Sequence, residues 1–219
     1  MAVRVALIHA VPMAVQPVAA AFDALWPDAE RMNLLDDALS VDRQRAGALT
    51  EPIAARIANL AAYAFAAGAD GILYTCSAFG EAIEAVARST DRPVLRPNEA
   101  MFDDALEAGA RIAMIATFPP SVPGMEAEFR QQAADRAATL ETICVPPAMD
   151  AARAGDTNTH NRLVAEAARE FAAGGYDALM LAQFSMASAL KAVQAVVPFP
   201  VLTSPASAVR RLKTRLAPR

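Results

Sequence analysis

The chain repeats itself at an offset of about 107 residues, and this duplication constrains the fold more than any other feature. Residues 5–15, VALIHAVPMAV, align with residues 112–122, IAMIATFPPSV, and residues 68–76, GADGILYTC, align with residues 175–183, GYDALMLAQ. Two shorter matches keep the same order: RPVL at 92–95 with FPVL at 199–202, and, one residue out of step, RAG at 45–47 with RAG at 153–155. The sequence therefore predicts two halves with the same fold.

Each half contains four short apolar runs bounded by Pro, Gly or Asp, a pattern typical of buried strands. The predicted strands are residues 3–9, 30–35, 71–75 and 93–95, followed by 111–116, 139–145, 177–182 and 200–203. Longer alanine-rich stretches with helical spacing lie between them, so that each half alternates strand and helix. Alternation of this kind predicts a parallel sheet covered on both faces. The expected fold class is α/β, with two pseudo-symmetric, flavodoxin-like parallel-sheet halves.

The expected domains are an N-terminal α/β half, residues 1–97 plus 205–219, and a C-terminal half, residues 98–204, that repeats it. The last helix, at about residues 205–216, has no strand after it, and we expect it to cross back over the first half. Ligands bind beyond the carboxyl ends of the strands in such sheets. A pseudo-twofold between the halves would place positions 76 and 183 in one interdomain active site.

Composition excludes several classes of function. The 219 residues are 55% hydrophobic and 20% charged, with a formal net charge of −4, which argues against a nucleic-acid partner. No apolar run reaches the roughly 18–20 residues needed to span a membrane. The start of the chain is too short and too strand-like for a secretion signal, and two cysteines make no disulfide framework. We expect a cytoplasmic protein, and a homo-oligomer is compatible with the sequence.

Cys76 occupies the most informative position, between an apolar strand and a helix-like stretch in GILYTCSAFG. The dipole and free N–H groups of a helix N-terminus stabilise a thiolate, so we expect a lowered pKa for this thiol and a functional role. The structural alternative is a buried, inert thiol. Cys144, within LETICVP, has the pattern of a core strand and is expected to be structural.

Hydroxyl groups flank the same strand ends. Thr75, Ser77 and Ala78 adjoin the thiol, and Ser77 could cap the following helix, hold a substrate carboxylate, or do both. Thr117 and Ser121, which open the second half, have the same two interpretations.

Two histidines and two acidic residues complete the candidates. His9 ends the first strand, where an imidazole could orient substrate, assist the thiol, or be structural. His160 is expected in the first turn of a surface helix with no role, and two separated histidines predict no metal site. Asp36 and Asp37 follow the second strand and are expected to be solvated or to cap a helix.

The sequence TCSA after an apolar strand and ATFPPS at 116–121 resemble the aspartate/glutamate/hydantoin racemase superfamily, which includes maleate isomerases and arylmalonate decarboxylases. The resemblance implies a small carboxylate substrate and two strand-end cysteines facing each other across the substrate α-carbon. One removes the α-proton and the other returns it, with no cofactor, while amides and hydroxyls hold the carboxylate. Cys76 matches the first position. The second falls on Gln183, whose amide cannot act as a proton base.

The resulting hypothesis is a cofactor-independent racemase or isomerase in which Cys76 transfers a proton at the carbon next to a carboxylate, and Gln183 binds substrate. The alternatives are a one-thiol, arylmalonate-decarboxylase-like lyase and a non-catalytic small-acid binding protein. The sequence lacks G-x-G-x-x-G, G-x-x-x-x-G-K-[ST] and G-x-S-x-G, and no lysine lies near a predicted strand end to hold pyridoxal phosphate.

Overall fold

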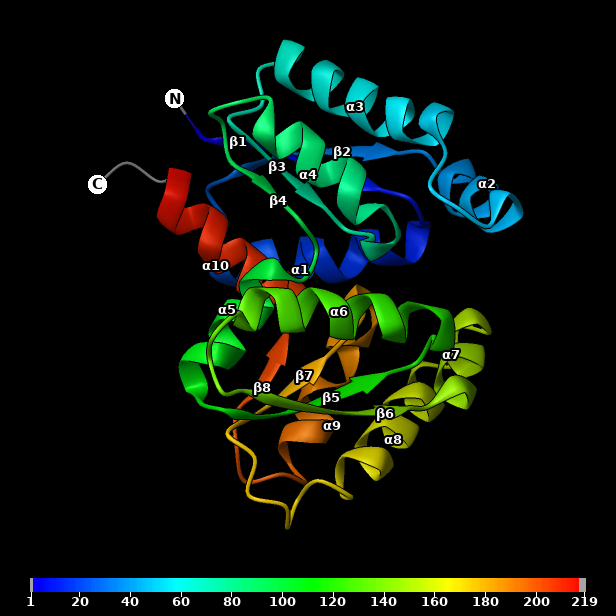
Figure 1. Ribbon diagram of the computed structural model, residues 1–219, viewed down its shortest axis with the longest axis vertical. Helices are drawn as coiled ribbons and strands as arrows, with labels where there is room; N and C mark the ends of the chain where they lie inside the picture. The colour runs from blue at the N-terminus through cyan, green and yellow to red at the C-terminus, as the bar shows by residue number, and fades with distance from the viewer. Residues whose placement is uncertain (1, 217–219) are drawn as a thin grey trace. The chain divides into compact units, whose positions relative to one another are not determined.

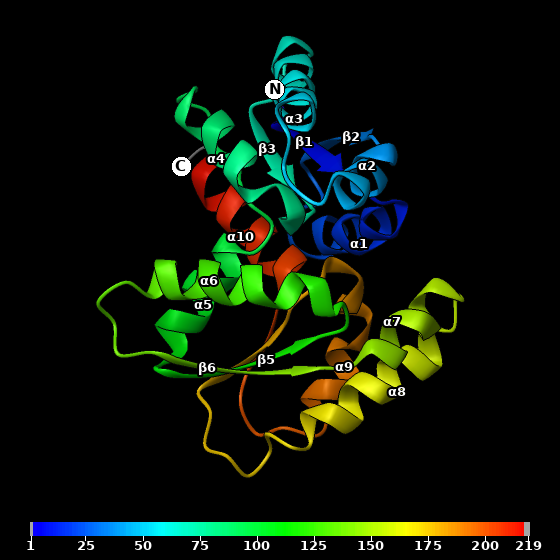
Figure 2. The same cartoon turned by 45° about the vertical axis from the view of Figure 1, so that its right-hand side comes forward.

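The computed structural model describes residues 2–216 (Figure 1). The chain forms two compact units. One runs from the N-terminus to Pro97 and resumes at Ala208, and the other runs from Asn98 to Ser207. Each unit contains a four-stranded sheet with helices packed against it (Figure 2). No helix among residues 2–216 has both the length and the apolar character needed to cross a membrane.

The two sheets have the same topology. The first has the strand order β2-β1-β3-β4 and the second β6-β5-β7-β8, and every pair of neighbouring strands is parallel. The strands are β1 (Arg4–His9), β2 (Glu30–Leu35), β3 (Gly71–Tyr74), β4 (Val94–Leu95), β5 (Arg111–Ala116), β6 (Thr139–Cys144), β7 (Ala178–Leu181) and β8 (Val201–Thr203). The predicted α/β class with two parallel-sheet halves is confirmed.

Helices connect the strands in the same order in both halves. The first half has η1 (Pro12–Ala14), α1 (Val15–Leu25), α2 (Ala38–Ala46), α3 (Glu51–Ala66), η2 (Ser77–Phe79) and α4 (Gly80–Arg88). The second has α5 (Glu99–Ala108), η3 (Pro119–Ser121), α6 (Val122–Ala133), α7 (Pro146–Arg153), α8 (Thr157–Ala168), η4 (Phe184–Ala189) and α9 (Leu190–Gln194), and α10 (Ser204–Leu216) ends the described chain.

Two helices, rather than the single helix expected, lie between the second and third strands of each half. Gly47 follows α2 with φ 68° and Gly155 follows α7 with φ 76°. A residue in this left-handed conformation ends a helix, and glycine adopts it without steric cost. The repeated RAG sequence therefore marks the same helix break in each half.

The core lies on both faces of the central strands, as continuous apolar runs require. Residues 5–9 of β1 and all of β3 are buried, whereas the edge strand β2 has only exposed and half-buried positions. The helix α3 covers one face of this sheet by burying Ile53, Ile57, Ala61 and Ala64, which follow helical spacing.

The amino ends of the two sheets share one hydrogen-bonding motif. Asp70 accepts a hydrogen bond from the backbone N–H of Arg4 at 2.8 Å, and Asp177 accepts one from the backbone N–H of Arg111 at 2.8 Å. A glycine with positive φ lies two residues before each aspartate. The sequence repeat therefore corresponds to a structural repeat down to individual bonds.

The last helix of each half packs away from its own sheet. The helix α5 follows β4 but belongs to the second unit, while α10 follows β8 and enters the first unit at Ala208. There Lys213 Nζ donates to the Leu25 carbonyl at 2.9 Å, and a Cβ added at Gly71 would lie 2.8 Å from Leu216 Cδ1. At the start of α10, Ser204 Oγ donates to Asn98 Oδ1 at 2.8 Å.

Candidate functional site

A polar chain crosses the carboxyl ends of the first sheet, from the exposed Asn33 on β2 to the buried His9 and Thr75. The order β2-β1-β3 brings Asn33, His9 and Thr75 side by side. His9 Nδ1 lies 2.9 Å from Thr75 Oγ1 and His9 Nε2 lies 3.0 Å from Asn33 Oδ1. Burial lowers the pKa of His9, although the hydrogen bond to Asn33 opposes this. The imidazole is therefore neutral near pH 7, and donation from Nε2 to Asn33 leaves Nδ1 to accept from the Thr75 hydroxyl.

His9 is fully buried and Thr75 is 6% exposed, so both lie beneath the surface on which a ligand would rest. His9 also holds the loop after β2, because its carbonyl accepts a hydrogen bond from the N–H of Asp36. This placement makes the pair a support for the next residue, Cys76.

Cys76 follows β3 in an extended conformation and is half-buried. Burial raises the pKa of its thiol, while the N–H of Ala78 and the hydroxyl of Ser40 oppose that rise. The expected lowering of this pKa is wrong in net direction. Cys76 does not adjoin an α-helix, because the single turn η2 intervenes and α4 begins only at Gly80, so desolvation prevails over the donors.

Ser77 is the first residue of η2 and is half-buried, and Ala78 is exposed. The N-cap positions of η2 and α4 are Cys76 and Phe79, so Ser77 occupies neither cap position. Its capping interpretation is therefore not supported by the structure.

Ser40 was not a candidate from the sequence. It lies on α2, which is placed beyond the carboxyl ends of β1 and β2 (Figures 1 and 2). Its Oγ donates to the carbonyl of Ala10 at 3.1 Å and also faces the Cys76 thiol. The one available signal was a hydroxyl a few residues after a strand in a sheet whose ligands bind at strand ends.

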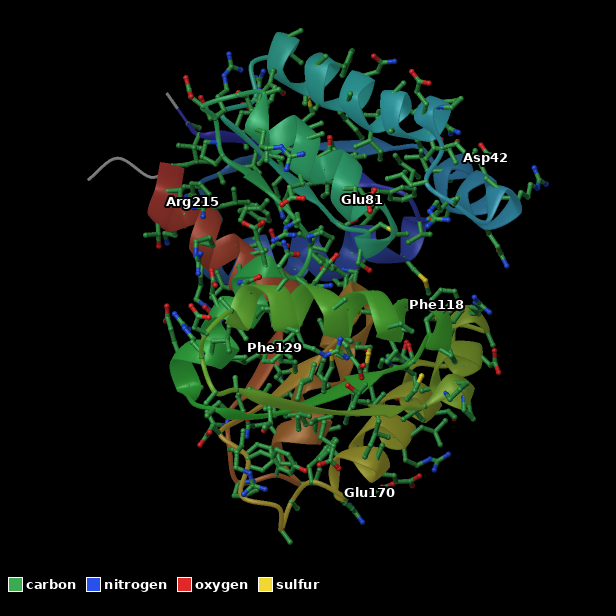
Figure 3. All side chains as sticks on the ribbon, in the orientation of Figure 1. Asp42, Glu81, Phe118, Phe129, Glu170 and Arg215 are labelled. Atoms are coloured by element: carbon green, nitrogen blue, oxygen red, sulfur yellow. The ribbon has the colours of Figure 1, made fainter. Side chains whose placement is uncertain are left out.

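Arg56 fastens α2 to α3. Its Nε and Nη2 donate to Asp36, at 2.9 and 2.6 Å to Oδ2, and its Nη1 donates to Asp42 at 2.6 Å. The hydrogen bonds to both carboxylates raise the pKa of Arg56, and the bond to Asp36 has the larger effect. Asp36 is thus an ion-pair partner rather than a solvated or capping residue, and Asp37 is the N-cap residue of α2 without a side-chain cap bond. Figure 3 marks Asp42 on α2.

The carboxyl end of the second sheet holds a closed hydrogen-bond network around Gln183. The Gln183 Oε1 accepts from the backbone N–H of Thr117 at 3.0 Å and from Thr117 Oγ1 at 3.2 Å. Its Nε2 donates to Ser121 Oγ at 3.1 Å, and Ser121 Oγ donates to the carbonyl of Phe118 at 2.8 Å. Two predicted site residues, Thr117 and Ser121, are therefore hydrogen-bonded to a third, Gln183, beside Phe118, which Figure 3 labels in the loop after β5.

Cys144 and His160 lie outside these groups. Cys144 ends the edge strand β6, half-buried against the apolar cluster of the second unit, and burial raises the pKa of its thiol. His160 lies in the first turn of α8, as expected, but the predicted surface position is wrong: it is 2% exposed and its Nδ1 lies 2.9 Å from the carbonyl of Ala148. Residues 2–216 contain no cluster of three or more metal-ligating His, Cys, Asp or Glu side chains.

A family model described as Asp/Glu/Hydantoin racemase matches residues 13–212. An allantoin racemase from Klebsiella pneumoniae has a similar structure, with 17% identity and a TM-score of 0.77 over 97% of this chain and 87% of that one. The structure of a glutamate racemase, RacE1 from Bacillus anthracis, has 13% sequence identity and a TM-score of 0.72, and the match covers 98% of this chain and 81% of that one. The aspartate racemase of Picrophilus torridus has 17% sequence identity and a TM-score of 0.71, and the match covers 97% of this chain and 94% of that one. No curated protein matches the chain.

Proposed function

Because the chain belongs to the Asp/Glu/hydantoin racemase family, we propose that it is an enzyme of racemase type in which Cys76 carries the proton. The observation that supports this most directly is the position of the thiol. Cys76 follows β3 at the carboxyl end of the first sheet, where ligands of such sheets bind, and two donors face its sulfur. Its substrate is proposed to be a small acid with a hydrogen on the carbon next to a carboxylate or comparable carbonyl.

The proposed step is a proton transfer without a cofactor. The Cys76 thiolate takes the proton from the α-carbon, forming S–H, and the C–H electron pair moves into the adjacent carbonyl group to give an enolate-like intermediate. The S–H hydrogen exchanges with solvent, the thiol returns a solvent hydrogen to the same face of the carbon, and the electron pair reverts, so that this thiol alone gives α-hydrogen exchange. The N–H of Ala78 and the hydroxyl of Ser40 stabilise the thiolate during this cycle, since both lower the pKa of the thiol.

The other candidate residues take different proposed roles. Ser77, half-buried beside the thiol, binds a substrate carboxylate oxygen. Thr75 and His9 are positioning residues, because they are buried and hydrogen-bonded to each other beneath Cys76. Thr117 and Ser121 likewise act through Gln183, to which both are hydrogen-bonded.

The test is α-proton exchange in deuterated water over a panel of amino acids, hydantoins and substituted malonates. Wild type should exchange the α-hydrogen of an intact substrate, and Cys76→Ala should lose about 10²–10⁴-fold in rate, the usual contribution of a general acid–base residue. Cys144→Ala, the other thiol of the chain, is the matched control and should retain the rate. Equal loss in both variants, or undiminished exchange by Cys76→Ala, would contradict the assignment.

A second candidate is a one-thiol lyase, and two observations favour it. Gln183 supplies no proton carrier, and burial raises the pKa of Cys76, so the resting residue is a thiol ready to donate. In a decarboxylation, CO₂ leaves with cleavage of its bond to carbon and the resulting carbanion takes the proton from sulfur. Deuterium from the solvent would then appear only in the product. A racemase would instead incorporate deuterium into the intact substrate, and a binding protein would incorporate it into neither.

A further inference from the structure

One side chain at the carboxyl end of the second sheet, that of Gln183, binds the polar groups of both Thr117 and Ser121. Both Thr117 donors, the N–H and the hydroxyl, converge on a single oxygen, Gln183 Oε1. The Ser121 hydroxyl donates to the Phe118 carbonyl and accepts from Gln183 Nε2. Reversing the Gln183 amide would set its NH₂ against the Thr117 N–H, so this orientation is fixed.

We propose that the Gln183 carboxamide fills a carboxylate-binding cradle formed by Thr117 and Ser121. Two donors aimed at one oxygen suit a carboxylate oxygen, and such charge-assisted bonds are stronger than those to an amide. The second carboxylate oxygen would replace Nε2, where the Ser121 hydroxyl can rotate from the Phe118 carbonyl to donate to it. Thr117 is fully buried, so these bonds form where water competes little.

The filled cradle determines which substrate group this half accepts, a consequence that rests on the proposed function. With Oε1 holding both Thr117 donors, Gln183 can offer a ligand only the second hydrogen of Nε2. A neutral carbonyl oxygen of a ligand needs only this single N–H donor. A ligand carboxylate would lack the further donors that offset its desolvation. The site around Gln183 should therefore accept a neutral carbonyl group in preference to a carboxylate.

The direct test needs no turnover. In Gln183→Ala, the truncation opens the cradle, and sodium acetate should raise the unfolding temperature relative to sodium chloride at equal ionic strength. For a ligand of four non-hydrogen atoms, an apparent Kd on the order of 1 mM or weaker is expected. Wild type should show a smaller acetate-specific shift, because its cradle is filled and only the site proposed beside Cys76 is open to the anion. Adding Thr117→Val to Gln183→Ala should abolish most of the response, because it removes one of the converging donors.

Gln194→Ala is the matched control. Gln194 also makes two side-chain bonds, accepting from the Val201 N–H and donating to the Phe199 carbonyl, each at 3.0 Å, but only one donor faces its oxygen. It should lose stability without gaining an acetate response. If Gln183→Ala responds to acetate no more than Gln194→Ala, the cradle is refuted, whether or not Cys76 proves to transfer protons.

Gln183→Glu provides an independent measurement that keeps the side chain in place. Three donors should depress the pKa of the introduced carboxyl group, so the variant should be stable at neutral pH. Since the depressed native pKa lies below the unfolded value of about 4.3, this stability should be lost as pH falls through the native pKa. A variant that is more stable at pH 5 than at pH 7, relative to wild type, would instead show a site that rejects a carboxylate.

Discussion

The Arg56 ion pairs offer the sharpest test of how the first half holds its site. Replacing Arg56 with Met keeps the packing of the aliphatic stem but removes both ion pairs. The change releases α2 from α3 and leaves the carboxylates of Asp36 and Asp42 without their shared cation. Because α2 carries Ser40, the change should also loosen the contact between that hydroxyl and the Cys76 thiol.

The magnitude follows from geometry and exposure. A hydrogen bond to a charged group contributes about 1.5–3 kcal/mol when it is buried. The side chains of Arg56, Asp36 and Asp42 are 33%, 25% and 37% exposed, so solvent screens the pairs and moves each toward the surface value of about 0–1 kcal/mol. The two ion pairs, one of them bidentate, therefore contribute about 1–2 kcal/mol to the free energy of unfolding. For a chain of this length, that lowers the unfolding temperature by about 2–8 °C.

The assay is thermal and urea unfolding of Arg56→Met beside Arg45→Met. Arg45 also faces Asp42, at 3.8 Å, but its side chain is 77% exposed, so its loss should change stability by less than about 0.5 kcal/mol. High salt should narrow the difference between Arg56→Met and wild type. Equal unfolding midpoints for the two variants would refute the view that Arg56 fastens α2.

Three further predictions concern other parts of the structure. His9 is buried with a lowered pKa, so stability should be lost as pH falls below about 6.5, and His9→Gln should flatten this dependence in unfolding curves recorded from pH 8 to 5. Gly109→Ala should cost more than about 2 kcal/mol in urea unfolding, because the added Cβ would clash with the Asp177 side chain. Ser40→Ala removes a group that lowers the pKa of the Cys76 thiol, so alkylation of Cys76 by iodoacetamide at pH 7.5 should slow.

Two of these predictions have a matched control variant. Ser40→Thr keeps the hydroxyl and should keep the alkylation rate, and Gly124→Ala, where a Cβ meets no atom within 4 Å, should not destabilise by a clash. An undiminished acid sensitivity in His9→Gln would show that other groups titrate. Faster alkylation in Ser40→Ala would mean that the hydroxyl shields the sulfur rather than stabilising the thiolate.

The strands were predictable because parallel strands buried on both faces must be continuous apolar runs. Val5 to Ile8 and Ile112 to Ala116 are such runs, and both prove to be central strands. The repeat then implied the same sheet in both halves. The helix breaks after α2 and α7 were not predicted, because the alanine-rich stretches have continuous helical spacing. The repeated RAG sequence was the available signal for them.

Side-chain partners were less predictable, because they depend on distances that the sequence does not contain. Nothing in the chain order links Arg56 to Asp36 twenty residues earlier, or Gln183 to Thr117 sixty-six residues earlier. The direction of the Cys76 pKa was wrong for a related reason. A strand-to-helix junction suggests helix donors, whereas the direction of the pKa shift depends on how closely the surroundings pack around the sulfur and on where the helix begins.

The two halves are alike at the amino ends of their sheets and differ at the carboxyl ends. At the amino ends, Arg4 with Asp70 and Arg111 with Asp177 form the same bond at the same distance, which secures the turn that begins the third strand of each sheet. At the carboxyl ends, the equivalent positions are Cys76 and Gln183, with different partners. A change at a strand end costs little stability when its polar groups find new partners, as Gln183 does with Thr117. The two halves thus share one sheet topology, while their equivalent strand ends carry a thiol in the first half and a carboxamide in the second.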